Sequence, residues 1–490
     1  MKQTSHVLVA LAITFGAAQM LGAQNAAPSL NEPAKQLPPV KPLGATFAKS
    51  AQLLDAVSAV RQLPGGRLLV NDIAGRKVVL FDSTLSKYAV VADTTSATAN
   101  AYSSRAGGLV KWKGDSTLFV DPLSLSMLVL NEKGAVSRVM STPRASDANL
   151  LIGGPSGTPG VDAMGRLVYR GTASRAGRGG FVWNGGQGGA QHSHDEGAGT
   201  NRSAGNRDAA SEKKTEAPLD SAPLLRLDLS ARKLDTITML RVAASNSRMA
   251  VDDQGKSKLL ITVNPLPEAD DWALMADGSV AVLRARDYHI DWIRADGTKE
   301  SSGKVPFDWK RMSEDEKSAF LDSTKVTLEK LRARVAAGDK SAAADLTGIA
   351  DLPGFGAAAG GGGGEGDHSH AGGGGGFGGE AGGRGNFGGR GRTESEVQPI
   401  NMVSASDLSD YVPPFTPGAA RGDMEGNLWV RTTRGIDGGS IYDVISPKGL
   451  LLKRVLMPPG RVVAGFGKGG VVYTGVREDG RVRLEAAKAP

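Results

Sequence analysis

The segment Asp277-Gly278-Ser279-Val280-Ala281-Val282 is a glycine-centred turn followed by a run of small and β-branched apolar residues. Glycine tolerates the positive φ of a hairpin turn, and the residues after it suit a buried strand. Five further segments have the same form: Pro64-Gly65-Gly66-Arg67-Leu68-Leu69-Val70, Lys113-Gly114-Asp115-Ser116-Thr117-Leu118-Phe119-Val120, Met164-Gly165-Arg166-Leu167-Val168-Tyr169, Glu425-Gly426-Asn427-Leu428-Trp429-Val430 and Lys468-Gly469-Gly470-Val471-Val472-Tyr473. Six copies of one hairpin predict a closed ring of small sheets.

Each hairpin is followed by a third strand rich in aliphatic residues, as in residues 77–82, 127–131 and 441–445. Several of these strands end in another turn, for example at Lys133-Gly134 and Asp296-Gly297. Four strands in each repeat are typical of a β-propeller blade. The sequence therefore predicts an all-β fold, a six-bladed β-propeller.

The spacing of the turn glycines is uneven. Gly165 and Gly278, and then Gly278 and Gly426, are separated by far more than the roughly 40 to 50 residues of one blade. We assign the surplus to two insertions, residues 171–218 in the third blade and residues 313–403 between the fourth and fifth blades. Both contain long Gly-rich tracts that cannot bury much apolar surface, so these tracts are expected to be disordered.

The second insertion begins with a helix signal. Ser313-Glu314-Asp315-Glu316 forms a capping box. An apolar stripe at helical spacing follows, made by Phe320, Leu328, Leu331 and Val335. Two roles stay open for this helix: packing across the face or flank of the propeller, or binding a partner.

The last repeat ends near Ala486 without an outer strand. Residues 45–49, just before the first repeat, are expected to supply that strand and close the ring, which removes exposed strand edges. The propeller is thus predicted to span residues 44–486, with the insertions inside it. Residues 24–43 form a flexible leader by the same analysis.

This pattern resembles the six-bladed β-propellers of the NHL and TolB-like group, in particular its exported bacterial members. The resemblance rests on the repeated turn and strand unit and on the phrase Val282-Leu283-Arg284-Ala285-Arg286-Asp287-Tyr288-His289-Ile290-Asp291-Trp292. It covers residues 44–486 apart from the insertions. Because the group includes binding modules, scaffolds, lactonases and lyases, the resemblance implies a fold and leaves the function open.

The N-terminus is typical of an export signal. Lys2 precedes an apolar run over residues 7–15, and small residues end at Ala23. Residues 1–23 are therefore expected to be a cleaved signal peptide, and the mature protein to be periplasmic or secreted. The chain contains no cysteine, so neither disulfides nor a bacterial lipid anchor are expected.

The formal net charge is +7. The basic residues are dispersed, and the expected export argues against a nucleic-acid partner, even though Gly383-Arg384-Gly385-Asn386-Phe387 resembles an RGG segment. We interpret the charge as a preference for anionic ligands or surfaces.

In a propeller, the connections from strand B to C and from strand D to the next A lie on one face. Both predicted insertions emerge from that face, and each carries a His-Ser-His element: His192 and His194, and His368 and His370. These imidazoles, with Asp195, Glu196 and Asp367 beside them, could hold zinc, nickel or copper. The alternative is that they are polar decorations of Gly-rich sequence, since ordering such tracts costs entropy.

The B to C loops bring further candidate ligand-binding residues around the central mouth of the same face. They are Asn71, Asp72, Arg76, Asp121, Arg170, Arg284, Arg286, Asp287, Tyr288, Arg431 and Arg434. Arginines outnumber acids, which favours an anionic group held by bidentate contacts. The competing interpretation is that these arginines pair with nearby aspartates or rest in water.

Catalysis is weighed below binding. The resemblance implies that a lyase would use propeller histidines and a lactonase a ring of carboxylate and amide ligands, yet His289 is the one histidine within the predicted blades. No G-x-S-x-G, H-E-x-x-H or P-loop motif occurs. A propeller lyase or lactonase-like hydrolase remains the alternative function.

We therefore predict a binding or scaffold protein that recognises an envelope protein, a peptide or an anionic glycan through the insert-bearing face. A monomer without nucleic acid, without a transmembrane segment and without a confidently assigned cofactor is expected. Weak divalent-metal binding by the two histidine elements is the third alternative.

Overall fold

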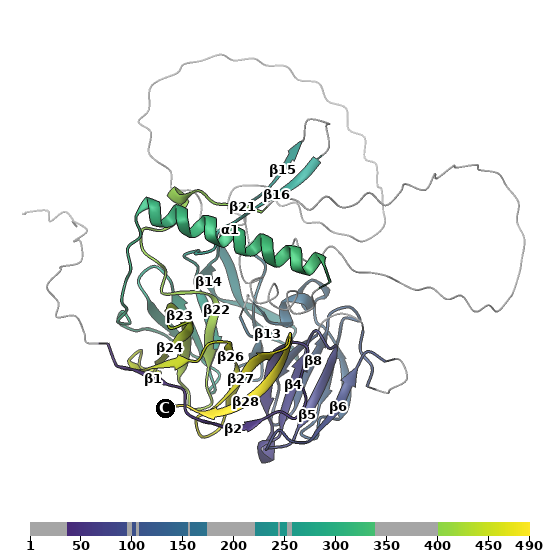
Figure 1. Cartoon of the computed structure of the whole chain (residues 1–490). Coiled ribbons are helices and arrows are strands. Elements are labelled where there is room, and N and C mark those ends of the chain that lie inside the picture. The colour runs from purple at the N-terminus through teal and green to yellow at the C-terminus, as the bar shows by residue number, and fades with distance from the viewer. Residues whose placement is uncertain are drawn as a thin grey trace, which may run out of the picture. The chain divides into compact units, whose positions relative to one another are not determined.

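The computed structural model describes residues 37–490 apart from 96–99, 104–106, 155–156, 174–220, 244–245, 252–256 and 339–399. Six blades, each with four antiparallel strands, follow one another around an axis, and the sheet of the fifth blade carries one additional strand (Figure 1). The six-bladed propeller predicted from the sequence is confirmed, and so is its all-β class. All six predicted turns contain a glycine with positive φ.

In each blade the strands run from A, nearest the axis, to D. The first three blades are β3 (Val57–Gln62), β4 (Leu68–Asp72), β5 (Lys77–Phe81) and β6 (Tyr88–Asp93); β7 (Gly108–Lys111), β8 (Thr117–Asp121), β9 (Ser126–Leu130) and β10 (Val136–Ser141); β11 (Gly160–Val161), β12 (Leu167–Arg170), β13 (Ser221–Asp228) and β14 (Lys233–Arg241).

The remaining blades follow the same order. They are β17 (Asp271–Leu274), β18 (Val280–Arg284), β19 (His289–Ile293) and β20 (Lys299–Ser301); β22 (Phe415–Gly422), β23 (Leu428–Ile436), β24 (Gly439–Ile445) and β25 (Leu451–Met457); β26 (Arg461–Gly467), β27 (Val471–Glu478), β28 (Arg481–Lys488) and β2 (Thr46–Lys49).

The core consists of layers between successive blades. Adjacent residues of a strand point to opposite faces of its sheet. Leu68 accordingly packs with Tyr473 of the sixth blade, whereas Leu69 packs with Phe119 of the second. Both faces of the blades are buried, which explains the nearly continuous apolar runs in the sequence.

The ring is closed by the N-terminal strand, as predicted. β2 pairs antiparallel with β28 and so completes the sixth blade. A second segment before it, β1 (Val40–Pro42), pairs in parallel with β25 at the edge of the fifth blade. The end of the segment expected to be a flexible leader is therefore held by backbone pairing.

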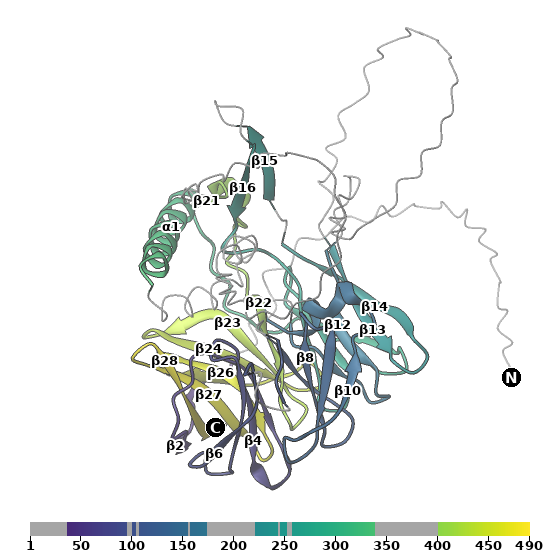
Figure 2. The same ribbon diagram turned by 90° about the vertical axis from the view of Figure 1, so that its right-hand side faces the viewer.

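The two faces of the propeller differ. We call the side with the A to B and C to D turns the turn face, and the side with the B to C and D to A connections the loop face. The loop-face connections carry the additional elements: α1 (Glu314–Ala336), β15 (Asn246–Val251), β16 (Ser257–Val263) and β21 (Asn401–Met402) (Figures 1 and 2). The 3-10 helices are η1 (Pro64–Gly66), on the turn face, and η2 (Ala145–Leu151) and η3 (Ala405–Asp407), on the loop face.

The sequence analysis did not predict the hairpin β15–β16. It lies between the third and fourth blades and is a third insertion. β16 pairs in parallel with β21, which belongs to the insertion between the fourth and fifth blades. Two insertions that are distant in the sequence thus share one small sheet.

Helix α1 begins at the predicted capping box, in which Ser313 and Glu316 exchange hydrogen bonds. Two residues of its predicted apolar stripe, Leu328 and Leu331, are buried against the inserted residues Val263 and Ile400, and the other two, Phe320 and Val335, are partly buried. Lys317 is also buried, and its Nζ lies 2.8 Å from Glu314 Oε1 and 2.8 Å from Asp410 Oδ1. None of the described helices is long and apolar enough to cross a membrane.

Candidate functional site

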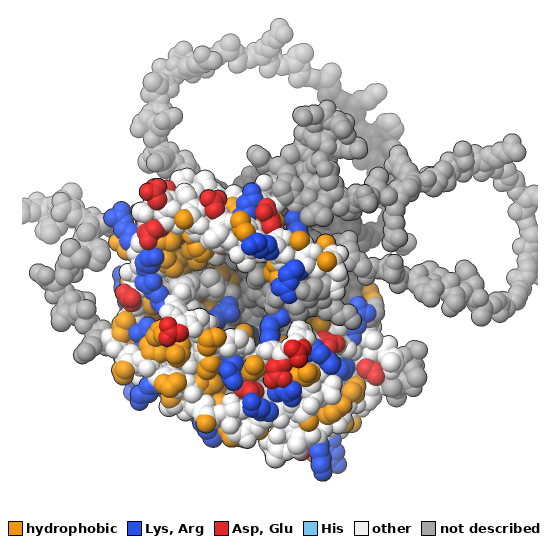
Figure 3. Space-filling model, in the orientation of Figure 1, with side chains coloured by type: hydrophobic (Ala, Val, Ile, Leu, Met, Phe, Trp, Pro, Cys, Tyr) orange, Lys and Arg blue, Asp and Glu red, His pale blue; other side chains and the backbone are white. Residues whose placement is uncertain are grey.

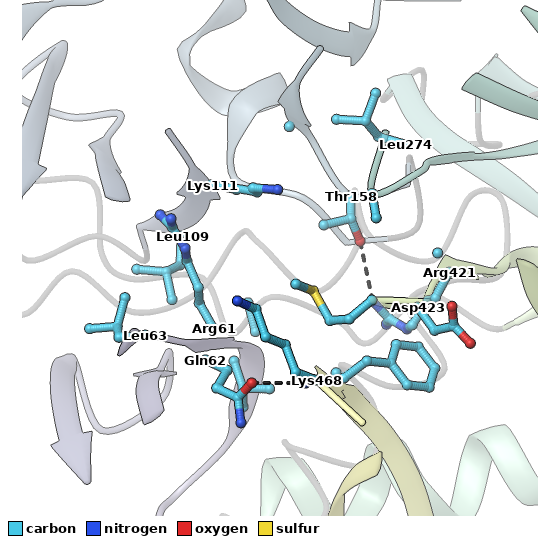
Figure 4. Close-up of a pocket in the computed structure, with 18 of the residues that line it drawn as sticks. Arg61, Gln62, Leu63, Leu109, Lys111, Thr158, Leu274, Arg421, Asp423 and Lys468 are labelled. Atoms are coloured by element: carbon cyan, nitrogen blue, oxygen red, sulfur yellow. Dashed lines mark hydrogen bonds between the residues drawn. The ribbon is translucent and has the colours of Figure 1, made fainter. Parts of the chain in front are cut away.

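A cavity of about 770 Å³ lies on the propeller axis (Figure 4). Its lining comes from the A strands and A to B turns of all six blades, for example Leu63, Leu109, Leu274 and Phe466. Because strand A runs from the loop face to the turn face, this cavity occupies the half of the channel that opens on the turn face. That is the face opposite the insertions.

Four cationic side chains line the cavity. Arg61 is on β3, Lys111 ends β7, Arg421 is on β22 and Lys468 follows β26. They belong to the first, second, fifth and sixth blades, which are consecutive around the closed ring. We call these four residues the cationic arc.

The cationic arc is fixed by neutral partners. The Arg61 guanidinium donates to Thr117 Oγ1 at 2.6 Å and to the carbonyl of Gly114 at 3.2 Å, and it also donates to the carbonyl of Ser116. Arg421 donates to Thr158 Oγ1 at 3.2 Å. Within the described part of the chain, no ion pair to a carboxylate is formed by any residue of the arc.

Two members of the arc, Arg61 and Arg421, are half-buried, and the other two, Lys111 and Lys468, are exposed. Burial lowers the pKa of Arg61 to about 10, and the charge of Asp115 only partly offsets this. Burial also lowers the pKa of Lys111, and the neighbouring charges of Arg61 and Lys468 lower it further. A bound anion would relieve this repulsion.

The two acids in the cavity lining do not neutralise the arc. The carboxylate of Asp423 is occupied by its own turn, since it accepts from the Asn427 backbone N–H at 2.7 Å and from Trp429 Nε1 at 2.9 Å. Asp115 is exposed at the tip of its turn. The cavity therefore keeps an excess of positive charge.

The remaining two blades give the cavity an uncharged wall. The third contributes Thr158 and Val161, and the fourth Leu274 and Met275. Charged and uncharged side chains are therefore separated inside the cavity. On the surface seen in Figure 3 they are mixed, with Lys and Arg side chains scattered among acidic and apolar ones.

On the loop face, the predicted aspartates are held by their own loops. Asp72 accepts from the backbone N–H groups of Ala56 at 2.9 Å and Gly75 at 3.0 Å. Asp121 accepts from Ser103 N at 2.9 Å and from Ser124 Oγ at 2.6 Å.

Several predicted arginines have protein partners. Arg284 contacts Asp270 at 2.7 Å and Asp291 at 2.8 Å. Arg434 donates from Nε to the carbonyl of Asp308 at 3.0 Å. Arg76 and Arg286 are exposed, and Arg431 is half-buried.

Two predicted residues belong to hydrogen-bonded pairs near the fourth blade. Asp287 Oδ1 lies 2.6 Å from His289 Nδ1. Tyr288 is fully buried and donates its hydroxyl to Asp443 Oδ2 at 2.9 Å. Burial raises the pKa of Asp443 to about 6, although this hydrogen bond and Arg454 act in the opposite direction.

Asn71 and Arg170 have buried polar atoms that lack a hydrogen-bond partner, Oδ1 of Asn71 and Nε of Arg170. Asn71 uses its Nδ2 to bridge to the carbonyl of Gly107 in the next blade at 2.8 Å. Arg170 lies near Asp271, whose charge raises the pKa of the guanidinium while burial lowers it more strongly. Ligand binding by the loop-face candidates stays a prediction.

Asp271 supplies a pH prediction. Burial raises its pKa to about 6, and the backbone N–H of Ala420 donates to its Oδ2 at 2.8 Å. The folded form binds a proton more tightly than the unfolded form, so this carboxyl destabilises the protein as the pH rises from about 4 to 6. Asp271→Asn should remove that contribution, about 2 to 3 kcal/mol of pH-dependent stability. Urea unfolding at pH 4, 5, 6 and 7 tests this, and identical pH profiles for both proteins would contradict it.

The histidine elements, His192 and His194 with His368 and His370, lie outside the described residues. Among the residues that are described, no three His, Asp or Glu side chains gather as metal ligands. Metal binding by these elements stays a prediction.

The cationic arc was missed by the sequence analysis. A signal for it exists, because each of its residues stands at the end of a predicted A strand or at the start of a glycine turn. In four of the six repeats a member of the arc precedes the turn glycine by one to five residues, so the positions are similar without being equivalent.

No protein-family model matches this sequence, and no curated protein matches it. Solved structures with a similar chain path include a putative exported protein from Bacteroides fragilis, with 9% identity, a TM-score of 0.37 and coverage of 92% of this chain and 98% of that one. Another is a luciferin-regenerating enzyme, with 10% identity, a TM-score of 0.35 and coverage of 92% and 96%.

A third is the virginiamycin B lyase of Staphylococcus aureus, in a catalytically inactive form, with 7% identity, a TM-score of 0.33 and coverage of 91% and 98%. Similarity at this level does not specify an activity for this chain. The fold assignment rests on the strand pairing described above.

Proposed function

We propose that this chain is an exported β-propeller binding protein that holds an anionic ligand in the axial cavity on its turn face. The observation that carries this proposal is the cationic arc, four cations from four consecutive blades without a carboxylate partner among the described residues. Keeping like charges close together, two of them on half-buried arginines, costs stability, and such costs are concentrated at binding sites.

The chemistry of the arc suits carboxylate or phosphate groups. Arg61 and Arg421 offer planar guanidinium groups, and Lys111 and Lys468 offer point charges on long stems. The cavity volume of about 770 Å³ is in the range of small-molecule sites. The uncharged wall of the third and fourth blades would contact the less polar part of the ligand.

Binding is favoured over catalysis by the composition of the cavity. Its lining residues include no histidine, Asp423 is saturated by hydrogen bonds from its own turn, and the free titratable groups are the exposed Asp115 and the lysines of the arc, which we assign to binding. General acid–base chemistry needs a titratable group free to reach the substrate. A lyase or lactonase-like reaction at the loop-face mouth stays the alternative, and recognition through the insert-bearing face stays a prediction.

Isothermal titration calorimetry with citrate and pyrophosphate tests the proposal. Methionine keeps the length of a lysine stem without its charge, so the double variant Lys111→Met/Lys468→Met should bind at least about tenfold more weakly than the wild type. Wild-type affinity should also fall as salt rises. Lys133→Met is the matched control, because Lys133 is an exposed lysine of a turn-face C to D turn outside the cavity lining.

The same double variant should unfold at a slightly higher temperature than the wild type when no ligand is present. The physical reason is relief of the repulsion between the lysines and Arg61. Equal anion affinity in the wild type and the double variant would overturn the proposal. Anion binding that is lost only on deleting residues 171–218 would place recognition on the loop face instead.

A further inference from the structure

A second hollow adjoins the axial cavity on the turn face. It measures about 580 Å³ and lies over the A to B turns of the second, third and fourth blades. It shares Lys111, Gly114, Val161 and Ala276 with the axial cavity. The two hollows therefore adjoin one another, and we call the second one the groove.

The floor of this groove is made of tightly packed turns. A Cβ on Gly278 would lie 2.1 Å from the backbone nitrogen of Ala163, so the turns of the third and fourth blades touch at the backbone. A Cβ on Gly165 would lie 2.8 Å from Cε of Lys113. Glycine at these two positions keeps the groove open and leaves room for the aliphatic part of the Lys113 side chain.

Lys113 provides a further cation along the groove. Its Nζ lies 5.4 Å from the centre of the Trp112 ring, a cation–π contact with a buried indole. Lys111 ends β7 and Lys113 follows Trp112 at the start of the turn, and both lysines line the second hollow. Lys111 thus lines both hollows, whereas Lys113 lines the groove alone.

The acids of the groove are engaged elsewhere. Asp162 forms ion pairs with Arg166 at 2.8 Å and with Arg226 at 3.1 Å. Asp277 accepts hydrogen bonds from both the backbone N–H and the hydroxyl of Ser279. Neither carboxylate forms an ion pair with Lys111 or Lys113 in the described part of the structure.

We infer that the ligand is a linear oligoanion rather than a single small anion. One anionic group would occupy the axial cavity between the residues of the cationic arc, and a following group would lie in the groove beside Lys113. This inference rests on the proposed function, because it extends the same site outward. Its chemistry is a chain of repeated phosphate or carboxylate groups.

Two length series test it by calorimetry. One series is orthophosphate, pyrophosphate and tripolyphosphate; the other is galacturonate and its dimer and trimer. In the wild type, affinity should rise with length in at least one series, and the series that responds identifies the anionic group.

Lys113→Met should weaken the binding of the longest ligand of that series roughly fivefold. The affinity for the shortest ligand should stay unchanged, because only the longer ligand reaches the groove. Lys113→Arg should restore the affinity, since it keeps the charge and the ring contact. Lys133→Met, an exposed lysine on the same face, should change neither ligand.

Failure of the inference is distinguishable from failure of the proposed function. If Lys113→Met leaves the longest ligand unaffected while Lys111→Met/Lys468→Met weakens every ligand, the groove is not used and the axial site stands. If affinity does not depend on length, the inference is likewise overturned. If no anion binds the wild type, the proposed function fails, and the inference fails with it.

Discussion

Gly278→Ala should destabilise the protein by about 3 to 5 kcal/mol, whereas Gly297→Ala in the same blade should cost only about 1 to 2 kcal/mol. Both glycines have positive φ, +82° and +94°, so both alanines incur the same kind of backbone strain. At Gly278 the new Cβ would also lie 2.1 Å from the backbone of Ala163, whereas at Gly297 no atom lies within 4 Å. The difference between the two variants therefore isolates the contact between blades.

The midpoint of urea unfolding, compared at an unchanged slope, measures this difference. Equal losses in the two variants would show that the turns of the third and fourth blades do not touch in solution. Because these turns form the floor of the groove, Gly278→Ala should also disturb binding of long anions more than binding of short ones.

The second large effect is expected at Asp162. The substitution Asp162→Ala should destabilise the protein by about 3 to 5 kcal/mol. Asp162 is buried and accepts hydrogen bonds from Arg166 Nε at 2.9 Å and from the backbone N–H of Met164 at 3.0 Å. It also pairs with the buried Arg226 at 3.1 Å. Without this carboxylate, two neighbouring guanidinium groups would be left without their shared counter-charge.

Asp277 is the matched control for Asp162. It lies in the A to B turn of the next blade, where Met275 takes the place equivalent to Asp162, and it is exposed and accepts hydrogen bonds from Ser279. Asp277→Ala should therefore cost about 1 kcal/mol. The double variant Asp162→Ala/Arg226→Met should regain part of the loss, since it removes the stranded charge. A single variant Asp162→Ala as stable as Asp277→Ala would contradict the assignment.

The blades could be predicted because their signals are local. A glycine turn such as Gly278 and the strand after it, Val280–Arg284, depend on φ preferences and on burial of a short run of residues. The hairpin β15–β16 was missed because it carries the same kind of signal as a blade, and its residues were counted as part of the long third repeat. No local sequence feature distinguishes a hairpin that belongs to a blade from one that lies outside the ring.

The candidate site was harder to predict. The loop-face arginines were predicted to bind a ligand because propeller loops vary freely. In the structure, however, Arg284 pairs with two carboxylates. The cavity residues looked ordinary in sequence, since a lysine at the end of a strand, such as Lys111, is usually solvated. Their significance depends on what surrounds them after folding.

The sequence by itself determined the strand order within the blades, the closure of the ring by residues near its start, and the face from which the two predicted insertions emerge. These follow from backbone preferences and from the alternation of strand directions, which are properties of short segments. Only the tertiary structure decided which side chains meet on the axis. Arg61 and Lys468 come from opposite ends of the chain and become neighbours because the sixth blade packs against the first, which brings cations that look ordinary in the sequence to one cavity.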